Sequence, residues 1–176
     1  IMRVAVLGAG AVGARIARQL LSGTSVTQIV LRDTDADRLA QVSKSLGDRV
    51  IIEHAPFNSK LDAEVIVVAT PSGTQVPAVV EAIEQRRPVI STSDSLAEMV
   101  ELLKLSEQAQ KNNIPVVLGA GFAPGLTCVL ASHGAAWFDK VQEIHIAKVG
   151  TGGPYCALVH HRALSRISYD WRHDNW

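Results

Sequence analysis

Short apolar runs alternate with longer segments of helical period over the first two thirds of the chain. The runs are rich in β-branched and aliphatic residues and predict strands at 3–7, 27–31, 50–53, 64–69, 88–91 and 115–118. The segments between them have apolar side chains three and four positions apart and predict helices at 11–22, 35–46, 75–85 and 95–112. Ser95, followed three residues later by Glu98, predicts a capping box at the start of the last helix. Strands that alternate with helices in this way indicate an α/β fold, a doubly wound parallel sheet covered by helices on both faces.

The pattern changes after the sixth predicted strand. A glycine-rich loop at 119–125 leads into an apolar helix at 126–138, in which we expect His133 to be a core residue. A strand follows at 140–149, where apolar and polar residues alternate as they do in a half-exposed sheet. This pattern differs from that of the fully buried parallel strands before it, and it indicates a change of architecture.

The chain therefore divides into two unequal parts. We expect the α/β domain to occupy residues 1–138, and residues 139–176 to be the start of a substrate or dimerisation domain. We expect this second part to be a short, incomplete α+β segment, either truncated or completed by a partner, because so few residues rarely form a core of their own. Residues 150–176 show no clear period, and the aromatic-rich end at 170–176 is interpreted as either a pocket wall or an interface.

Composition narrows the classes of partner. Lys and Arg together number 17, as do Asp and Glu, so the net charge is zero, and no run of one sign predicts binding to nucleic acid or an anionic membrane. No stretch reaches the ~20 uncharged apolar residues of a membrane span. We expect a soluble, cytoplasmic protein with a small-molecule substrate. Cys128 and Cys156 have no second thiol at metal-ligand spacing, and we expect both to be reduced.

The strongest chemical signal lies directly after the first predicted strand. Residues 8–13 are Gly-Ala-Gly-Ala-Val-Gly, a G-x-G-x-x-G pattern at the start of an amphipathic helix. In this context Gly8 permits the tight turn, Gly10 has no side chain to keep a pyrophosphate from the backbone, and Gly13 lets the helix lie close to the sheet. Free N–H groups and the helix dipole then favour phosphate. The pattern predicts a Rossmann-type site for a nicotinamide dinucleotide.

An acidic residue at the end of the second predicted strand supports the same site. Asp33 lies twenty residues after Gly13, where this fingerprint has the carboxylate that accepts a hydrogen bond from the ribose 2′-hydroxyl. A carboxylate there repels a 2′-phosphate, so Asp33 favours NAD over NADP. Arg32 and Arg38 are near enough in sequence to bind that phosphate, and NADP therefore stays open.

Other polar residues follow the fourth and fifth predicted strands, at the sheet edge where ligands bind in open α/β folds. Thr70 and Ser72 are expected to contact the cofactor, to cap the next helix, or to do both, and Asp94 or Ser95 is expected to be a helix cap.

The sequence identifies neither a catalytic residue nor a metal site. His160 and His161 are adjacent, and in a strand they would point to opposite faces, which makes them a poor metal pair. His145 or His160 could donate a proton, but neither has an identifiable partner carboxylate.

Taken together, these motifs resemble the saccharopine dehydrogenase-like family of reductases, which includes saccharopine reductase and carboxynorspermidine dehydrogenase. The matching features are VLGAGAVG at 6–13, the acid Asp33, VVATPSG at 67–73 and GAGFAPGLT at 119–127. The resemblance spans residues 2 to about 150. It implies NAD(P)-dependent oxidoreduction at a CH–NH bond, with an imine as the group that accepts hydride.

The resemblance also implies where the cofactor binds. The implied contacts are Gly8, Gly10, Ala11, Val12, Gly13, Asp33, Thr70, Pro71 and Gly121. The loop at 122–125 would face the nicotinamide and the substrate. Two departures from the family are visible: Ala123 stands where family members commonly have an acid before the proline, and the segment after residue 149 is much shorter than the family's substrate domain.

Two other functions fit the residues. One is a dinucleotide-binding or sensing module without chemistry of its own, favoured by the short second segment and the lack of an assignable acid or base. The other is a homoserine or aspartate dehydrogenase-like reductase, because fold alone does not fix the chemistry. The loop at 119–125 favours the saccharopine-like reductase over both. The apolar helix at 126–138 predicts a homodimer.

Overall fold

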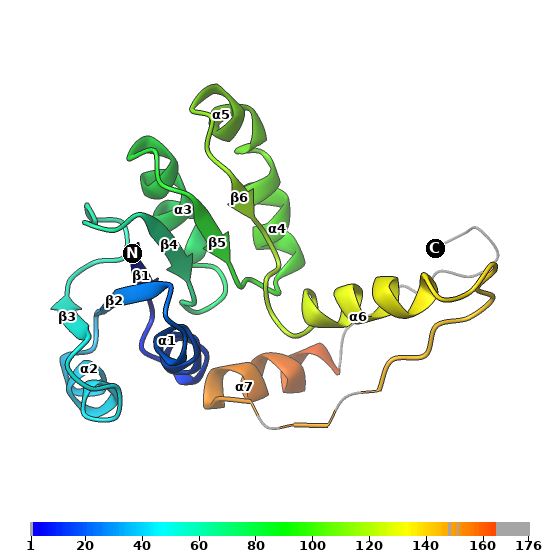
Figure 1. The fold of residues 1–176 in the computed structure, drawn as a ribbon, viewed down its shortest axis with the longest axis horizontal. Helices are drawn as coiled ribbons and strands as arrows, with labels where there is room; N and C mark the ends of the chain where they lie inside the picture. Colours follow the sequence, from blue (N-terminus) through cyan, green and yellow to red (C-terminus); the bar gives the residue numbers. More distant parts are fainter. Residues whose placement is uncertain (1, 148, 151, 165–176) are drawn as a thin grey trace.

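Six parallel strands form a single sheet in the order β3-β2-β1-β4-β5-β6 (Figure 1). The computed structural model describes residues 2–147, 149–150 and 152–164. The strands are β1 Met2–Leu7, β2 Val26–Asp33, β3 Val50–His54, β4 Val65–Val68, β5 Val89–Ser91 and β6 Val116–Val117. All six predicted strands are present, and the doubly wound α/β fold is confirmed.

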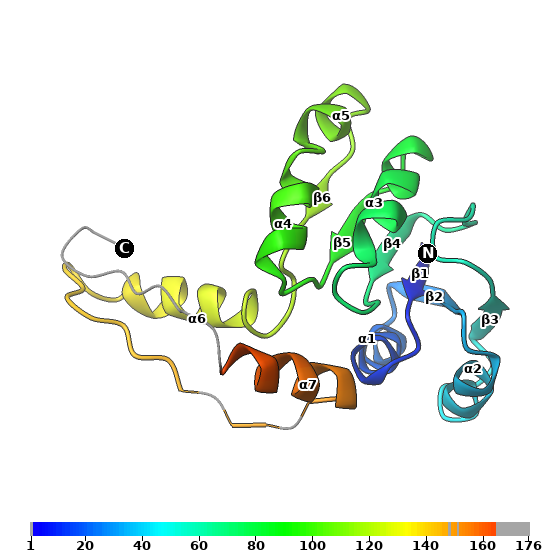
Figure 2. The same ribbon diagram turned by 180° about the vertical axis from the view of Figure 1, so that it is seen from behind.

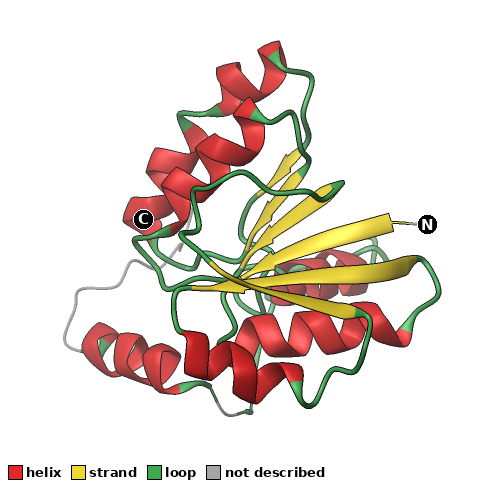
Figure 3. Cartoon of the chain, turned by 90° about the vertical axis from the view of Figure 1, so that its left-hand side faces the viewer, coloured by secondary structure: helices red, strands yellow, loops and turns green. Residues whose placement is uncertain are grey.

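Helices cover both faces of this sheet (Figure 3). The helices are α1 Ala11–Ser22, α2 Ala36–Ser43, α3 Gln75–Glu84, α4 Leu96–Leu103, α5 Ser106–Lys111, α6 Leu126–Ala135 and α7 Pro154–Ala163. Buried side chains of α1 and α2 belong to one core cluster, and those of α3, α4 and α5 belong to the other.

Strand alternation divides the core into these two halves. Along β1, Ala5 and Leu7 pack on the side of α3, whereas Val4 and Val6 pack on the side of α1, and all four are at most 2% exposed. Strands buried on both faces need apolar residues at nearly every position, which explains the continuous hydrophobic runs in the sequence. Each fully buried Val or Leu contributes about 1.5–3 kcal/mol of transfer free energy.

The strand order places a topological switch at the centre of the sheet. β1 pairs with β2 on one side and with β4 on the other, so the chain leaves β1 in one direction and returns on the opposite side. The loops that follow β1 and β4 lead to helices on opposite faces of the sheet, α1 and α3, and we name the region between these two loops, at the carboxyl edge, the crevice. In open parallel sheets this crevice is where ligands bind.

The helix predicted at 11–22 is confirmed with the same bounds, whereas the other predicted helices are shorter in the structure. Instead of one helix over 95–112 there are α4 and α5, and the N–H of Leu105 bonds the carbonyl of Leu102, three residues back, at the break. Such an i−3 bond tightens the last turn of α4 and ends its regular ladder. The helix predicted to reach residue 138 ends at Ala135.

Residues beyond α6 differ most from the prediction. The expected strand at 140–149 is absent from its described part, 140–147 and 149, and Ile144 and Ile146 are each more than half exposed. A strand forms only where a neighbour accepts its hydrogen bonds, and no described segment pairs with this one.

Helix α7 was not predicted, because residues 150–176 show no clear period; Pro154 fits the first turn of this helix. His160 and His161 therefore lie on a helix and not on a strand. Helices α6 and α7 lie beyond the carboxyl edge of the sheet (Figures 1 and 2). The aromatic-rich segment 170–176 lies outside the described residues.

His133 is exposed and not a core residue, because α6 buries only Thr127. Its ring meets that of Trp137 edge to face, with centroids 6.1 Å apart.

Candidate dinucleotide site

The glycine-rich turn between β1 and α1 has a distinct steric role for each glycine. Gly8 has φ +99°, and a Cβ there would lie 2.5 Å from the carbonyl oxygen of Ala69. A Cβ at Gly13 would lie 1.8 Å from the carbonyl oxygen of Gly8, so only glycine lets α1 approach the turn. A Cβ at Gly10 would meet no atom within 4 Å. The fold therefore requires Gly8 and Gly13, whereas the space in front of Gly10 is open to a ligand.

This open space lies at the N-terminus of α1. Gly10 is the N-cap residue, no side chain caps the helix, and Ala11 and Val12 in its first turn are exposed. Unsatisfied N–H groups at a helix start, together with the helix dipole, form an anion site. The residues present thus fit a pyrophosphate.

Asp33, at the end of β2, is hydrogen-bonded to the glycine-rich turn. Its carboxylate accepts hydrogen bonds from the backbone N–H of Ala9 at 2.6 Å and from that of Asp35 at 3.0 Å. These bonds place the acid beside the glycine-rich turn, where the sequence fingerprint predicts it. A carboxylate has about four lone-pair sites, so two remain for ribose hydroxyls.

Arg38, in the first turn of α2, binds the next peptide group of the same turn. Its Nε donates to the carbonyl oxygen of Ala9 at 2.9 Å, and its Nη1 donates to Oε1 of Gln41 at 2.8 Å. The side chain is half-buried. The guanidinium therefore lies against the turn that precedes Gly10.

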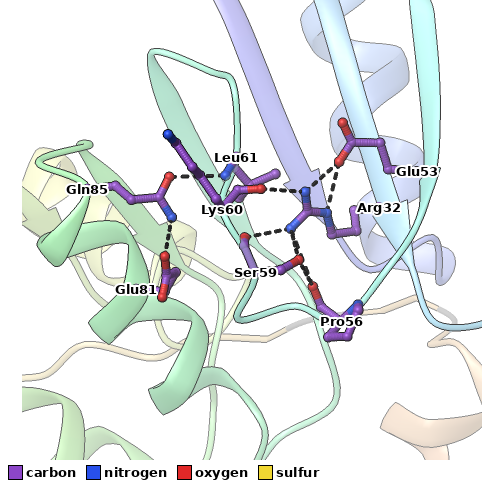
Figure 4. Close-up of polar contacts among 8 residues, drawn as sticks. All are labelled: Arg32, Glu53, Pro56, Ser59, Lys60, Leu61, Glu81 and Gln85. Carbon is purple, nitrogen blue, oxygen red and sulfur yellow. Dashed lines mark hydrogen bonds and ion pairs between the residues drawn. The ribbon is translucent and has the colours of Figure 1, made fainter.

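Arg32, by contrast, is a structural residue. It is buried and donates from Nε to Glu53 at 3.0 Å, from Nη1 to the carbonyl oxygen of Ser59 at 2.7 Å, and from Nη2 to that of Lys60 at 2.9 Å (Figure 4). Strand alternation turns it to the face opposite Leu31, away from the core cluster of α1 and α2. The hypothesis that Arg32 binds a 2′-phosphate is therefore wrong.

The loop after β4 forms the second wall of the crevice. Thr70 is buried behind Gly8, and Pro71 is exposed next to it. Thr74 is the N-cap residue of α3, so the alternative interpretation that Thr70 or Ser72 caps this helix is wrong. The hydroxyl of Thr74 lies 2.9 Å from that of Thr70 and holds the loop closed.

A buried polar network, which the sequence did not reveal, connects this wall to the next strand. The Glu98 carboxylate accepts from the N–H of Gln75 at 2.7 Å and from the hydroxyl of Ser93 at 2.6 Å. The Gln75 side-chain amide donates to the carbonyl of Thr70 and accepts from the hydroxyl of Ser91. Ser95 does cap α4, but Glu98 reaches α3 and does not close a capping box. The Ser95-to-Glu98 spacing was the only sign of this network.

Removal of the Glu98 carboxylate should destabilise the folded state. In Glu98→Leu the N–H of Gln75 and the hydroxyl of Ser93 lose their acceptor while buried, and we expect a loss of about 2–3 kcal/mol in the free energy of unfolding. Glu98→Gln keeps one acceptor and should cost less than half of that. Urea unfolding of both variants measures this, and equal stability of Glu98→Leu and the wild type would contradict the assigned role.

The loop at 119–125 lies at the same edge, next to β5. The N–H of Ala120 bonds the carbonyl of Ser91, and Gly121 pairs with Gly125, whose φ is +123°. A Cβ at Gly125 would lie 2.2 Å from the carbonyl oxygen of Gly121. The structure therefore brings Gly121 to the edge that carries Thr70, two strands away from Gly8.

The start of α7 returns to the crevice. A Cβ built on Gly153 would lie 3.1 Å from Cβ of Ala11, and the Tyr155 hydroxyl donates to the carbonyl oxygen of Ser72 at 3.0 Å. A segment distant in sequence thus contacts both the first turn of α1 and the loop after β4.

No acid–base pair is found in the crevice among the described residues. His145 has a carboxylate partner, Glu143, at 2.9 Å, but both side chains are more than three-quarters exposed and lie beyond α6. Over residues 2–147, 149–150 and 152–164 there is no cluster of three His, Cys, Asp or Glu that could hold a metal, and Cys128 and Cys156 are free. None of the described helices is long and apolar enough to cross a bilayer.

The family comparison matches the half of the chain that carries this site. The family model described as "NADP oxidoreductase coenzyme F420-dependent" matches residues 3–95, which is more than half of the chain and includes the glycine-rich turn, Asp33 and Thr70. The chain belongs to this family. Membership of the NADP oxidoreductase family agrees with a site for NAD(P), as the fingerprint predicted.

Relatives and solved structures share the same fold. Inositol 2-dehydrogenase 1 of Saccharopolyspora erythraea is 30% identical over 59% of this chain and 32% of its own length. Saccharopine dehydrogenase (L-Glu forming) of Saccharomyces cerevisiae has a TM-score of 0.62 at 19% identity, covering 76% of this chain and 30% of that one. The WlbA dehydrogenase of Chromobacterium violaceum, solved with NADH and UDP-GlcNAcA, has a TM-score of 0.61 at 18% identity, covering 77% and 40%. This chain spans about a third of the length of the curated relatives it matches.

Proposed function

We propose that this chain binds a nicotinamide dinucleotide at the β1–α1 turn and serves an NAD(P)-dependent oxidoreductase of the saccharopine dehydrogenase-like type. The observation that carries the proposal is the open space at Gly10. Its two neighbouring glycines are packed against backbone, whereas a side chain at Gly10 would extend into empty space at an uncapped helix start. Packing does not require a glycine at this position, but a pyrophosphate does.

Each wall of the crevice then has a task. The N–H groups at the start of α1 hold the pyrophosphate, and the free lone pairs of Asp33 accept from the adenosine ribose hydroxyls. Thr70, Pro71 and Gly121 contact the nicotinamide half along the strand ends. Bound NAD(P)H supplies a hydride. The contribution of this chain is to fix the direction from which that hydride leaves and to shield the bond-forming atoms from water.

We propose a CH–NH centre, an imine or amino acid, as the site of hydride transfer. The motif GAGFAPGLT at 119–127, which resembles that of the saccharopine-like reductases, supports this, because the loop lies at the edge of the sheet where a substrate meets the nicotinamide. A CH–OH centre of a polyol or sugar is the second candidate, and the inositol 2-dehydrogenase among the relatives favours it.

Turnover assays separate these candidates. The purified chain is given NADH or NADPH with pairs of 2-oxo acid and amine, and, in the reverse direction, NAD or NADP with cyclitols. Consumption of reduced cofactor only with the oxo acid and amine pairs supports the imine. Reduction of cofactor by cyclitols assigns the CH–OH reaction, and dinucleotide binding without any turnover supports a non-catalytic module.

We also propose a homodimer in the cytoplasm. Val129, Leu130, Trp137 and Phe138, on and just after α6, are each at least 58% exposed, and large apolar side chains exposed to this extent are typical of an interface. Sedimentation equilibrium of the purified chain tests the dimer, and a monomer at all concentrations would refute it.

A further inference from the structure

Asp33, at the end of β2, and Arg38, in the first turn of α2, bind the two backbone groups of Ala9 in the cofactor loop. The N–H of Ala9 donates to Asp33, and its carbonyl oxygen accepts from Arg38. An anionic and a cationic side chain are therefore fixed within one residue of Gly10, where the dinucleotide is proposed to approach the backbone. Both belong to the segment that faces the adenosine ribose in a Rossmann site.

The carboxylate at this position is partly neutralised. Both oxygens of Asp33 accept backbone N–H bonds, at 2.6 and 3.0 Å. Each such donor offsets negative charge, which lowers the repulsion that a carboxylate exerts on a nearby phosphate. Asp33 alone still provides nothing to attract one.

Arg38 has unused capacity to do so. A guanidinium has five N–H donors, and the contacts recorded for Arg38 in the described part of the chain use only Nε and Nη1. Arg32 differs, because its guanidinium already donates to Glu53 and to the carbonyl oxygens of Ser59 and Lys60. Of the two arginines near the ribose acid, only Arg38 has donors to offer to a ligand.

We propose that Arg38 binds the 2′-phosphate of NADP(H), so that this site accepts both NAD(H) and NADP(H). The inference rests on the proposed dinucleotide site and assigns its cofactor specificity. With NAD(H), the free lone pairs of Asp33 accept from the ribose 2′-hydroxyl. With NADP(H), the planar fork of Arg38 donates to phosphate oxygens in the geometry that guanidinium favours, and its charge offsets that of Asp33.

The test is calorimetric titration of the full chain with NADH and NADPH, which differ only in the 2′-phosphate. The variants are Arg38→Gln, which removes the charge, Arg38→Lys, which keeps it, and Arg18→Gln as a control. Arg18 is also an exposed arginine on a surface helix, and its guanidinium donates to the hydroxyl of Ser45 at 3.1 Å. We expect the wild type to bind both cofactors, with dissociation constants within about tenfold of each other.

Arg38→Gln should weaken NADPH at least about tenfold more than NADH, because bonds to a charged partner are lost. Arg38→Lys should retain part of the NADPH affinity, and Arg18→Gln should change neither. Equal weakening of both cofactors by Arg38→Gln would overturn the inference, because Arg38 would then act only through its bond to the carbonyl oxygen of Ala9. It would also be overturned if the wild type bound NADH but not NADPH. Absence of binding to either cofactor would refute the proposed dinucleotide site itself.

Discussion

Gly10→Val should abolish dinucleotide binding and leave the fold intact. The backbone of Gly10 is extended, with φ −69° and ψ −171°, so valine adopts it without strain, and its Cβ meets no atom within 4 Å. The side chain would instead occupy the space proposed for the pyrophosphate. Valine is a poorer N-cap than glycine, and we expect a stability loss of no more than about 1 kcal/mol.

Thermal unfolding with and without NADH measures both effects. Cofactor at about a hundredfold excess over its dissociation constant stabilises the wild type by about 2.7 kcal/mol, and Gly10→Val should show no such shift. Gly13→Ala is the matched control: its Cβ would lie 1.8 Å from the carbonyl oxygen of Gly8, so it should unfold more easily even without ligand. A normal NADH shift in Gly10→Val would contradict the assigned pyrophosphate position.

Arg32→Met should destabilise the protein by about 3 kcal/mol without changing cofactor preference. The substitution keeps an apolar stem but leaves Glu53, which is one-third exposed, without its cationic partner, and the carbonyls of Ser59 and Lys60 without donors. The loop before β4 then keeps the contacts at its other end, where Gln85 accepts from the N–H of Leu61 (Figure 4) and Asp62 pairs with Arg3.

Urea unfolding of Arg32→Met and Arg18→Met tests this role. Arg18→Met, which replaces an exposed arginine, should lower the free energy of unfolding by less than about 0.5 kcal/mol. The ratio of NADPH to NADH affinity should be unchanged in Arg32→Met, in contrast to Arg38→Gln. A change in that ratio would indicate that Arg32 contacts the cofactor. Unchanged stability would contradict its structural role.

The elements that the sequence predicted best depend on local pattern. Strands buried on both faces are hydrophobic throughout, and the turn at Gly8, Gly10 and Gly13 needs its residues at fixed spacing, so both are visible without a partner. Asp33 was likewise predicted from a fixed spacing, because it lies twenty residues after Gly13 in the sequence. The structural role of Arg32, in contrast to that of Arg38, could have been inferred from strand alternation, because Arg32 and Leu31 point to opposite faces of the sheet.

Long-range contacts account for what was missed. Glu98 bonds Gln75, twenty-three residues away in the sequence, and nothing local distinguishes that from a capping box. The alternation at 140–149 is a real pattern, but alternation makes a strand only when a neighbour supplies the ladder. Helix α7 has polar and apolar residues without a clear stripe, and its contact with Ser72 spans 83 positions.

Calorimetric titration of the wild-type chain with NADH is the most direct test of the central claim, that the turn at Gly8–Gly13 is a dinucleotide site. The account predicts saturable binding of one NADH per chain, competed by NADPH and lost in Gly10→Val. Absence of heat or competition with either nucleotide, from a chain that unfolds cooperatively and is therefore folded, would contradict it.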